Sequence, residues 1–299
     1  MARILISGAS GLIGSALTSA FRQRGDDVTA LVRRATRGGS EREWHPETTI
    51  SPEIISGFDA VIHLSGESVA GRWNEAKKRR IRDSRVMTTQ NLTRALVAAE
   101  KKPAVFVCAS AIGYYGNRGD EELTESSAAG RGFFPNSCRE WEAATGPAQE
   151  AGIRVANLRI GIVLSRTGGA LRQMLLPFRL GLGGRIGSGR QWWSWIHISD
   201  FVCAVLHILP AASSTSLSGA INMTTPNPVT NAEFTESLVR ALHRPAVFPM
   251  PTFAARLVFG EFADEGLLAS ARVVPEKLQA SGFQFKFPEL AGALADLLA

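Results

Sequence analysis

Tyrosine and cysteine are scarce in this chain. Its 299 residues include two tyrosines and three cysteines. Cys108, Cys138 and Cys203 show no paired spacing, which argues against a disulfide framework and is typical of a reducing compartment. The apolar run Phe201–Leu209 is too short to cross a bilayer, and we see no secretory signal. We therefore expect a cytoplasmic protein with no membrane partner.

Acidic residues are fewer than basic ones, and the net charge is +6. Much of the excess lies between Arg72 and Arg85, where seven basic residues accompany two acidic ones. Such a run is typical of a solvated helix face, although a bound cofactor phosphate could use some of its charges. Nucleic-acid binding would need interleaved aromatic residues or a known module. The sequence has neither, so we expect no nucleic-acid partner.

Apolar segments and helical segments alternate along the first half of the chain. Strands are predicted at 3–6, 28–32, 60–64, 104–108 and 155–164, and helices at 12–24 and 74–100. This alternation predicts an α/β fold with a Rossmann-type, doubly wound parallel sheet.

The character of the chain changes after Leu164. Glycines between Gly168 and Gly189 indicate a loop, apart from helix-like spacing at 171–180, and we interpret 181–189 as a mobile segment over the substrate side. A helix is predicted near 199–209, and prolines divide the chain beyond 245 into short helices. We expect a large domain over 1–240, with its core at 1–165, and a smaller substrate-side lobe over 245–299.

The strongest motif is a glycine loop between the first strand and the first helix. It reads Gly8-Ala9-Ser10-Gly11-Leu12-Ile13-Gly14. Gly8 permits a tight turn, Gly11 lets the backbone approach a pyrophosphate, and Gly14 allows close helix–strand packing. The helix N-terminus then favours the anion through its free N–H groups and its dipole. The loop predicts a dinucleotide site that includes Ser10, Leu12 and Ile13.

The end of the second strand indicates which dinucleotide binds. An NAD site places an acidic residue there to accept a hydrogen bond from the ribose 2′-hydroxyl. This chain has Val32 followed by Arg33 and Arg34. Guanidinium groups can hold a 2′-phosphate instead, so we predict NADP(H), although two arginines can also simply end a strand.

Further motifs resemble a known family along nearly the whole chain. They are Val61–Glu67, Arg72–Asn74, Leu175–Gly184, Trp195–Asp200, Thr230–Phe234, Gly282–Phe285 and Phe287–Leu290. Together with the glycine loop, they resemble the extended short-chain dehydrogenase/reductase superfamily in its NAD-dependent epimerase/dehydratase branch. More narrowly, the chain is similar to the "epimerase family protein" group, whose members end in a small C-terminal domain of unknown function.

The resemblance implies further cofactor contacts. Leu64, Ser65 and Gly66 should pass under the adenosine ribose and the pyrophosphate. Arg85, and less directly Arg80, lie on the helix that faces the cofactor in this superfamily. Val163 should bring its backbone to the nicotinamide, although a valine that ends a strand is usually a core residue.

The superfamily's catalytic pattern is broken in this chain. Its tyrosine and the lysine four residues later correspond to Phe134 and Cys138, and phenylalanine carries no transferable proton. Ser110 is the candidate for the superfamily's serine or threonine. Tyr114 and His197 are the nearest replacement acids, although Tyr114 could be a packed aromatic and His197 an ordinary histidine at the pocket rim.

The sequence therefore predicts an NADP(H)-binding oxidoreductase that acts on an unknown small molecule. Two alternatives stay open, a non-catalytic NADP(H) sensor and a nucleotide-sugar epimerase, and the sequence does not decide whether the chain is an enzyme. The five histidines show no H-E-x-x-H or H-x-x-E-H spacing and accompany no cysteine pair, so no metal site is expected.

Overall fold

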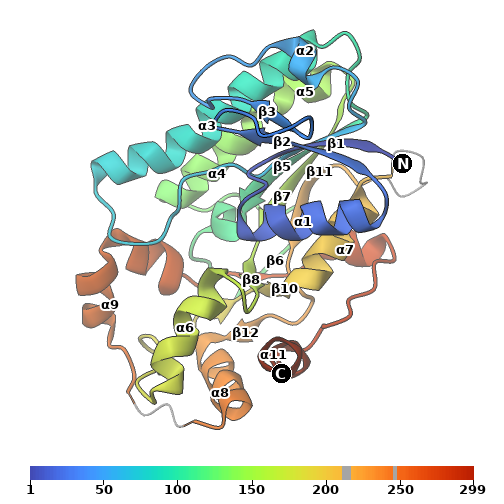
Figure 1. Ribbon diagram of the computed structural model, residues 1–299. Coiled ribbons are helices and arrows are strands. Elements are labelled where there is room, and N and C mark those ends of the chain that lie inside the picture. The colour runs from blue at the N-terminus through green and yellow to red at the C-terminus, as the bar shows by residue number, and fades with distance from the viewer. Residues whose placement is uncertain (211–216, 245–247) are drawn as a thin grey trace.

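A seven-stranded parallel sheet forms the centre of the molecule (Figure 1). The computed structural model describes residues 1–210, 217–244 and 248–299. The strands lie in the order β11 (Gly219–Met223), β7 (Arg154–Ile160), β5 (Val105–Ala111), β4 (Ala60–His63), β1 (Arg3–Ser7), β2 (Asp27–Val32) and β3 (Glu41–Glu43). The parallel Rossmann-type sheet predicted from the alternation of segments is confirmed.

Helices cover both faces of the sheet because each central strand is apolar on both sides. Ile4 and Ile6 of β1 pack with α1 (Leu12–Gln23) and α7 (Ile198–Ile208). Leu5 faces the opposite layer, because successive side chains of a strand point to opposite faces. That layer contains α2 (Pro52–Ile55), α3 (Glu75–Ala98), α4 (Phe133–Ala143) and α5 (Gly146–Glu150).

The long strand predicted at 155–164 is divided at Gly161. A Cβ atom there would lie 2.7 Å from the Ser194 carbonyl oxygen and 2.8 Å from Cγ2 of Thr224, so the close backbone approach requires glycine. Beyond it, β8 (Ile162–Leu164) leaves the central sheet and pairs with β10 (Trp195–His197). Helix α6 (Gly169–Arg179) agrees with the helix-like spacing at 171–180 inside the otherwise loop-like stretch after Gly168.

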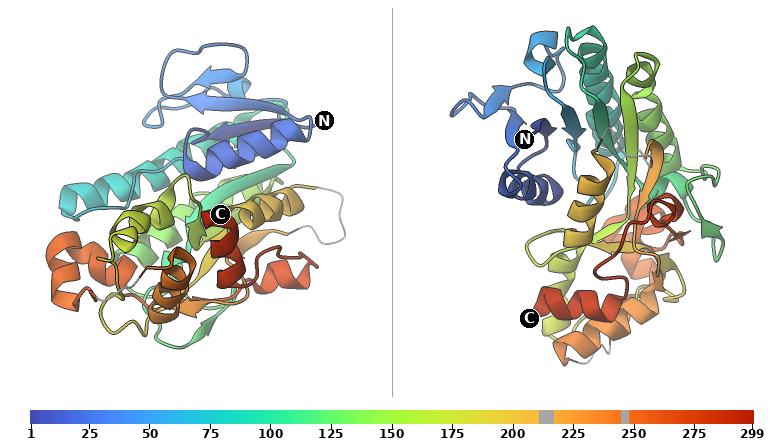
Figure 2. Two further views of the ribbon diagram at one scale, coloured as in Figure 1. Left: turned by 60° about the horizontal axis from the view of Figure 1, so that its bottom comes forward. Right: turned by 90° about the vertical axis from the view of Figure 1, so that its right-hand side faces the viewer.

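The lower lobe is built from segments that are far apart in the sequence (Figure 2). Its apolar cluster joins α6, α8 (Asn231–Leu242) and α11 (Leu290–Leu298). Short strand pairs link β9 (Trp192–Trp193) to β12 (Val229–Thr230), and β6 (Glu122–Leu123) to β13 (Arg272–Val273). The remaining elements are η1 (Ile112–Tyr115), α9 (Thr252–Phe259), η2 (Ala263–Leu267) and α10 (Glu276–Ala280). The division into domains at 1–240 and 245–299 stays a prediction.

Two carboxylates attach the C-terminal segment to the larger lobe. Asp200, at the start of α7, accepts hydrogen bonds from the backbone N–H groups of Lys286 and Phe287 at 2.9 and 2.8 Å. Glu265 of η2 accepts from the N–H groups of Phe133 and Phe134 at 2.8 and 2.9 Å. The second contact places an acidic side chain at the N-terminus of α4, where the helix dipole favours it.

None of the described helices is long and apolar enough to cross a membrane.

Replacing Asp200 with alanine should destabilise the fold. Two N–H groups would lose their charged acceptor, which should lower the free energy of unfolding by about 2–4 kcal/mol in a urea titration. Glu236→Ala is the matched control, because its side chain is 67% exposed and surface changes usually stay within about 0.5 kcal/mol. Equal stability of the two variants would contradict the role given to Asp200.

Candidate nucleotide-binding site

Two glycines of the loop between β1 and α1 are required by the protein's own packing. Gly8 has a φ of +74°, and a Cβ there would lie 2.9 Å from the carbonyl carbon of Leu64. A Cβ on Gly14 would lie 2.2 Å from the carbonyl oxygen of Gly8. The loop, the first turn of α1 and the end of β4 are therefore in backbone contact.

Gly11 differs from these two glycines. Its φ is −75°, which any residue adopts, and a Cβ there would meet only the Gly8 carbonyl oxygen, at 3.4 Å. The protein itself therefore leaves room for a side chain at this position, and Ser10 and Gly11 are exposed. The free space at Gly11 agrees with the prediction that this glycine lets a bound pyrophosphate approach the backbone. Leu12 and Ile13 begin α1 and are half-buried.

A buried polar pair, Ser7 and His63, lies where β1 and β4 end, next to the glycine loop. Ser7 Oγ lies 2.6 Å from Nδ1 of His63, and Thr88 Oγ1 lies 3.4 Å from its Nε2. Burial lowers the pKa of His63 to about 4, so its imidazole is neutral near pH 7. Ser7 also accepts a hydrogen bond from the Leu64 N–H at 3.3 Å. The ends of β1 and β4 are thus joined by side chains as well as by the sheet.

The two arginines after Val32 have different surroundings. Arg34 binds both carboxylate oxygens of Glu41, at 2.9 and 2.6 Å. Arg33 is exposed and makes no ion pair among the described residues. Glu41 comes from the neighbouring strand β3, and nothing in the residue pattern indicated that it would bind Arg34 and leave Arg33 unpaired. Arg33 is therefore the arginine available to an external phosphate.

Arg85 lies directly beside the turn that follows β4. A Cβ on Gly66 would be 3.2 Å from Cζ of Arg85. The guanidinium donates to the Ile81 carbonyl at 2.9 Å and lies over the Trp141 ring, 5.2 Å from its centroid. Burial lowers the pKa of Arg85, and no carboxylate of the described residues lies within ion-pair distance of it. Arg85 is thus a half-buried cation with no anionic partner in the part of the chain that the structure describes.

The other expected cofactor contacts are less distinctive. Arg80 is 61% exposed, with its Nε 3.9 Å from Glu67, and Glu67 is already bound by Lys77 at 2.7 Å. Ser65 and Leu64 are half-buried. Val163 is buried in β8, and its carbonyl oxygen would lie 3.4 Å from a Cβ on Gly169. The roles of these residues stay predictions.

Ser110 belongs to a buried network beneath the end of β5. Its hydroxyl donates to Glu142 Oε1 at 2.7 Å. Glu142 is also bound by Arg159, which contacts both of its carboxylate oxygens at 2.9 Å. The Ser110 proton is therefore engaged inside the protein, and polarising a substrate carbonyl would require that bond to break.

The two tyrosines occupy opposite environments. Tyr115 is fully buried, donates to Asn222 Oδ1 at 2.7 Å and accepts from Arg159 at 3.0 Å, and burial raises its pKa to about 12. Tyr114 is half-buried, with the Arg159 guanidinium 3.4 Å from its ring centroid. No hydrogen bond of the Tyr114 hydroxyl is found among the described residues. Sequence reasoning missed Arg159 and Tyr115, and the only available signal was an arginine inside an apolar strand.

The positions of the missing tyrosine and lysine are apolar. Phe134 meets the ring of Trp73 edge-on with centroids 4.8 Å apart, and Phe133 and Phe262 complete this cluster. Cys138 is buried, and burial raises its pKa to about 12 although the nearby Arg85 acts in the opposite direction. Neither residue can exchange a proton readily near pH 7.

His197 lies apart from this edge. Its Nδ1 accepts from the Ser199 N–H at 3.1 Å and caps α7, while its ring stacks near Phe287 with centroids 4.1 Å apart. Asp296 of α11 lies 3.3 Å from its Nε2. These partners belong to α7 and the C-terminal segment, so the structure does not bring His197 together with Ser110 and Tyr114. In the described part of the chain, no cluster of histidine, cysteine and acidic side chains could hold a metal ion.

The parallel sheet and the glycine loop at its carboxyl edge define a Rossmann-type protein similar to the extended short-chain dehydrogenases. The NAD dependent epimerase/dehydratase family matches residues 4–223, and a domain of unknown function, DUF1731, matches residues 250–297. The chain belongs to the NAD-dependent epimerase/dehydratase family, as its motifs predicted.

Full-length relatives carry the name "epimerase family protein". One from Mycobacterium bovis is 46% identical, and the match covers 97% of this chain and 96% of that protein. The human protein SDR39U1 is 38% identical over 99% of this chain and its own full length. A crystal structure of human SDR39U1 with NADPH superposes with a TM-score of 0.90, at 36% identity and 99% coverage of both chains.

A second solved structure is described as a nucleoside-diphosphate sugar epimerase from Corynebacterium glutamicum. It is 34% identical with a TM-score of 0.81, and it covers 99% of this chain but 58% of that one. More distant structures, such as a UDP-N-acetylglucosamine 4-epimerase from Bacillus cereus at 16% identity and a TM-score of 0.76, share the fold.

The buried imidazole predicts a pH dependence of stability. The folded pKa of His63, about 4, lies below the unfolded value of about 6.5. Between these two pKa values, the imidazole is protonated in the unfolded chain and neutral in the folded protein. The free energy of unfolding therefore decreases as the pH falls through this range. Between about pH 7 and pH 4.5 the loss from this group should be roughly 2–3 kcal/mol.

Urea titrations of His63→Gln should show a smaller loss of stability over this pH interval than the wild type. His45→Gln is the control, because His45 is 54% exposed and its replacement should leave the slope unchanged. A wild-type slope in His63→Gln would show that other groups cause the pH dependence.

Proposed function

We propose that this chain binds NADP(H) at the carboxyl edge of its sheet and uses it in an oxidoreduction of a small molecule. The observation that carries the proposal is Arg33, an exposed guanidinium at the end of β2 with no ion-pair partner among the described residues. The relative solved with NADPH, at 36% identity over 99% of both chains, supports the same cofactor.

The residues present fit the dinucleotide. Gly11 leaves space for the pyrophosphate at the start of α1, where free N–H groups favour an anion. Arg33 would bind the 2′-phosphate through charge-assisted hydrogen bonds. When bound, NADPH supplies a hydride to the substrate.

Arg85 would provide the positive charge that the superfamily's lysine supplies and that Cys138, at the position of this lysine, does not. Its guanidinium lies beside Gly66 and close enough to Cys138 to influence the pKa of that thiol. A buried cation without a counter-ion is costly, and a cofactor phosphate or ribose at Gly66 would remove part of that cost. The guanidinium would thus hold the cofactor from the α3 side, where the superfamily uses a lysine from the next helix.

Tyr114 is the proton donor that the geometry favours. Phe134 has no acidic proton, the Cys138 thiol is held protonated by burial, and the Ser110 proton is bound by Glu142. The Tyr114 hydroxyl, in contrast, makes no hydrogen bond among the described residues, and the Arg159 guanidinium lies 3.4 Å from its ring centroid.

A non-catalytic NADP(H) sensor is the second candidate. The apolar cluster of Trp73, Phe133, Phe134 and Phe262 favours the sensor. In this cluster, a packed phenylalanine side chain occupies the position of the superfamily's acidic tyrosine. Nucleotide-sugar epimerisation is a third reading, which rests on the description of one relative.

Cofactor choice should depend on Arg33 more than on Arg34. Titrations should show tighter binding of NADPH than of NADH. Arg33→Ala should remove most of the difference, because a charged hydrogen bond to phosphate is worth about 1.5–3 kcal/mol. Arg34→Ala is the matched variant and should lose less, since Glu41 already binds that guanidinium. Equal affinities of the wild type for the two cofactors would contradict the proposal.

Tyr114→Phe should lower the rate of hydride transfer without changing NADPH affinity. Positioned acid catalysis contributes about 10²–10⁴-fold, so we expect a loss of at least about tenfold. The measurement is single-turnover oxidation of NADPH with a carbonyl substrate identified by a metabolite screen, since simple ketones should react slowly. His197→Ala should keep the wild-type rate. An unchanged rate in Tyr114→Phe would exclude it as the acid, and tight NADPH binding with no substrate in the screen would favour the sensor.

A further inference from the structure

Exposed apolar side chains gather on two segments of the lower lobe. Of the ten large apolar residues that are exposed in the described part of the chain, seven lie in 176–182 and 248–258. They are Leu176, Leu180, Leu182, Phe248, Phe253, Leu257 and Val258, with exposed fractions of 56–73%. Exposed apolar side chains that gather in one region of a surface usually mark an interaction site.

The two segments are neighbours in space. The N–H of Met250 donates to the Arg185 carbonyl at 2.9 Å, and the N–H of Gly187 donates to the Met250 carbonyl at 2.8 Å. Figure 1 and the left view of Figure 2, in which the bottom of the molecule comes forward, both place α6 and α9 at the same end of the molecule. We call residues 166–190 and 248–260 together the basic apolar face.

The charge of this face has one sign. Its two segments contain six arginines and no aspartate or glutamate, although the whole chain has 33 basic and 27 acidic residues. Among the described residues, Arg256 is paired with Asp264 at 2.9 Å, and Arg166 donates to the main-chain oxygen of Ala299 at 3.1 Å. The basic N-terminus of α3 adjoins the face, since Arg72 donates to the Leu257 carbonyl at 3.2 Å and Lys78 binds Glu261 at 2.8 Å. The basic run noted in the sequence thus adjoins the face, although carboxylates pair with Lys77, Lys78 and Arg82.

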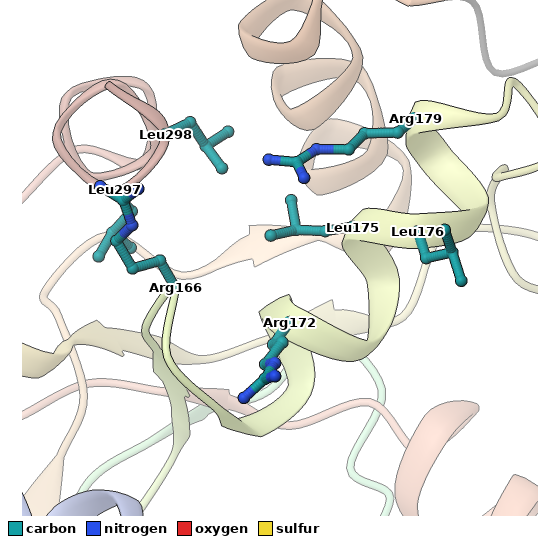
Figure 3. A pocket seen from close by; sticks show the side chains of 7 residues that line it. All are labelled: Arg166, Arg172, Leu175, Leu176, Arg179, Leu297 and Leu298. Carbon is teal, nitrogen blue, oxygen red and sulfur yellow. The ribbon is translucent and has the colours of Figure 1, made fainter.

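A shallow groove runs along one side of α6. It has a volume of about 350 Å³ and is lined by Arg166, Arg172, Arg179, Leu175, Leu176, Leu297 and Leu298. Figure 3 shows Arg179 extending from α6 toward α11, with Arg166 rising below α11. Guanidiniums around a leucine floor suit an anionic headgroup with an apolar chain attached.

We propose that the basic apolar face binds peripherally to an anionic membrane surface. Exposed leucine and phenylalanine side chains would enter the boundary between headgroups and acyl chains, and the arginines around them would contact lipid phosphates. A second copy of the chain fits less well, because a symmetric contact sets arginine against arginine. An acidic protein also fits less well, because the apolar side chains protrude from two elements and do not line one deep recess.

This proposal departs from the expectation of no membrane partner. That expectation rested on the absence of a long apolar run, which concerns helices that cross a bilayer. Peripheral binding depends instead on which apolar residues are left exposed after folding, and this is visible only in the structure.

Vesicle co-sedimentation of the full chain tests the proposal. The vesicles are phosphatidylcholine alone or phosphatidylcholine with about 30% phosphatidylglycerol, which supplies an anionic surface. We expect the protein to pellet with the anionic vesicles and not with the neutral ones, and to be released as salt is raised. Absence of binding to the anionic vesicles would overturn the proposal.

Two pairs of substitutions separate the apolar and the charged contributions. Phe253→Ser with Leu257→Ser, and Arg172→Gln with Arg179→Gln, should each weaken partitioning by about fivefold or more. Met87→Ser and Arg94→Gln are matched controls outside the face, since Met87 is 49% exposed and Arg94 is exposed on α3. Unchanged partitioning of both variant pairs would refute the face as the site.

Two further measurements identify another occupant. If light scattering shows a dimer that either variant pair dissociates, a second copy covers the face and the proposal fails. If the protein ignores vesicles but binds polyglutamate through the same arginines, the partner is an acidic polypeptide and the proposal also fails. Thermal unfolding followed by circular dichroism establishes that each variant is folded, and the exposed positions of the substituted side chains make this outcome expected.

Discussion

Beneath the edge of the sheet where β5 ends, the Glu142 carboxylate and the Arg159 guanidinium form a doubly hydrogen-bonded ion pair that is nearly closed to solvent, with side-chain exposures of 13% and 5%. Such a pair is costly to bury unless its remaining hydrogen-bonding groups are also satisfied. Ser110 supplies a donor to Glu142, and the Tyr115 hydroxyl accepts from Arg159 and continues to Asn222. The pair thereby connects α4, β7, β5, η1 and β11, and it determines which hydroxyls remain at the candidate active site.

The chemistry of the site follows from how this network distributes protons and charge. Ser110 donates to a buried carboxylate and Tyr115 is enclosed in the core, so neither hydroxyl is free for a substrate. The positions of the superfamily's tyrosine and lysine hold Phe134 and Cys138. The cation that the superfamily places four residues after its tyrosine is absent, yet Arg85 brings a guanidinium near Cys138 from another helix. In the function we propose, Arg85 of α3 would supply the charge toward the cofactor while α4 has lost the usual proton donor, because the two groups come from different helices.

The C-terminal segment is attached through the same physical principle. Asp200 and Glu265 each place one carboxylate on two backbone N–H groups, and charged acceptors make such bonds stronger than neutral ones. Glu265 holds the first turn of α4, the helix that carries Phe134 and Cys138. The position of that helix thus depends on residues more than a hundred places later in the chain.

The sequence by itself determined the inner strands of the central sheet, the glycine loop and the arginines after β2, but it did not reveal the edge strands β3 and β11. These features depend on local patterns: continuous apolar runs for strands buried on both faces, glycines at fixed spacing, and residues that directly follow a strand. Long-range packing decided the rest. Glu41 binds Arg34 and not Arg33, and Glu142 accepts a hydrogen bond from the Ser110 hydroxyl. Gly161 divides one strand between two sheets, and His197 packs against the C-terminal segment. Each of these outcomes depends on a partner from a distant segment, and residue type and spacing within one segment carry no information about which partner the folded chain will bring there.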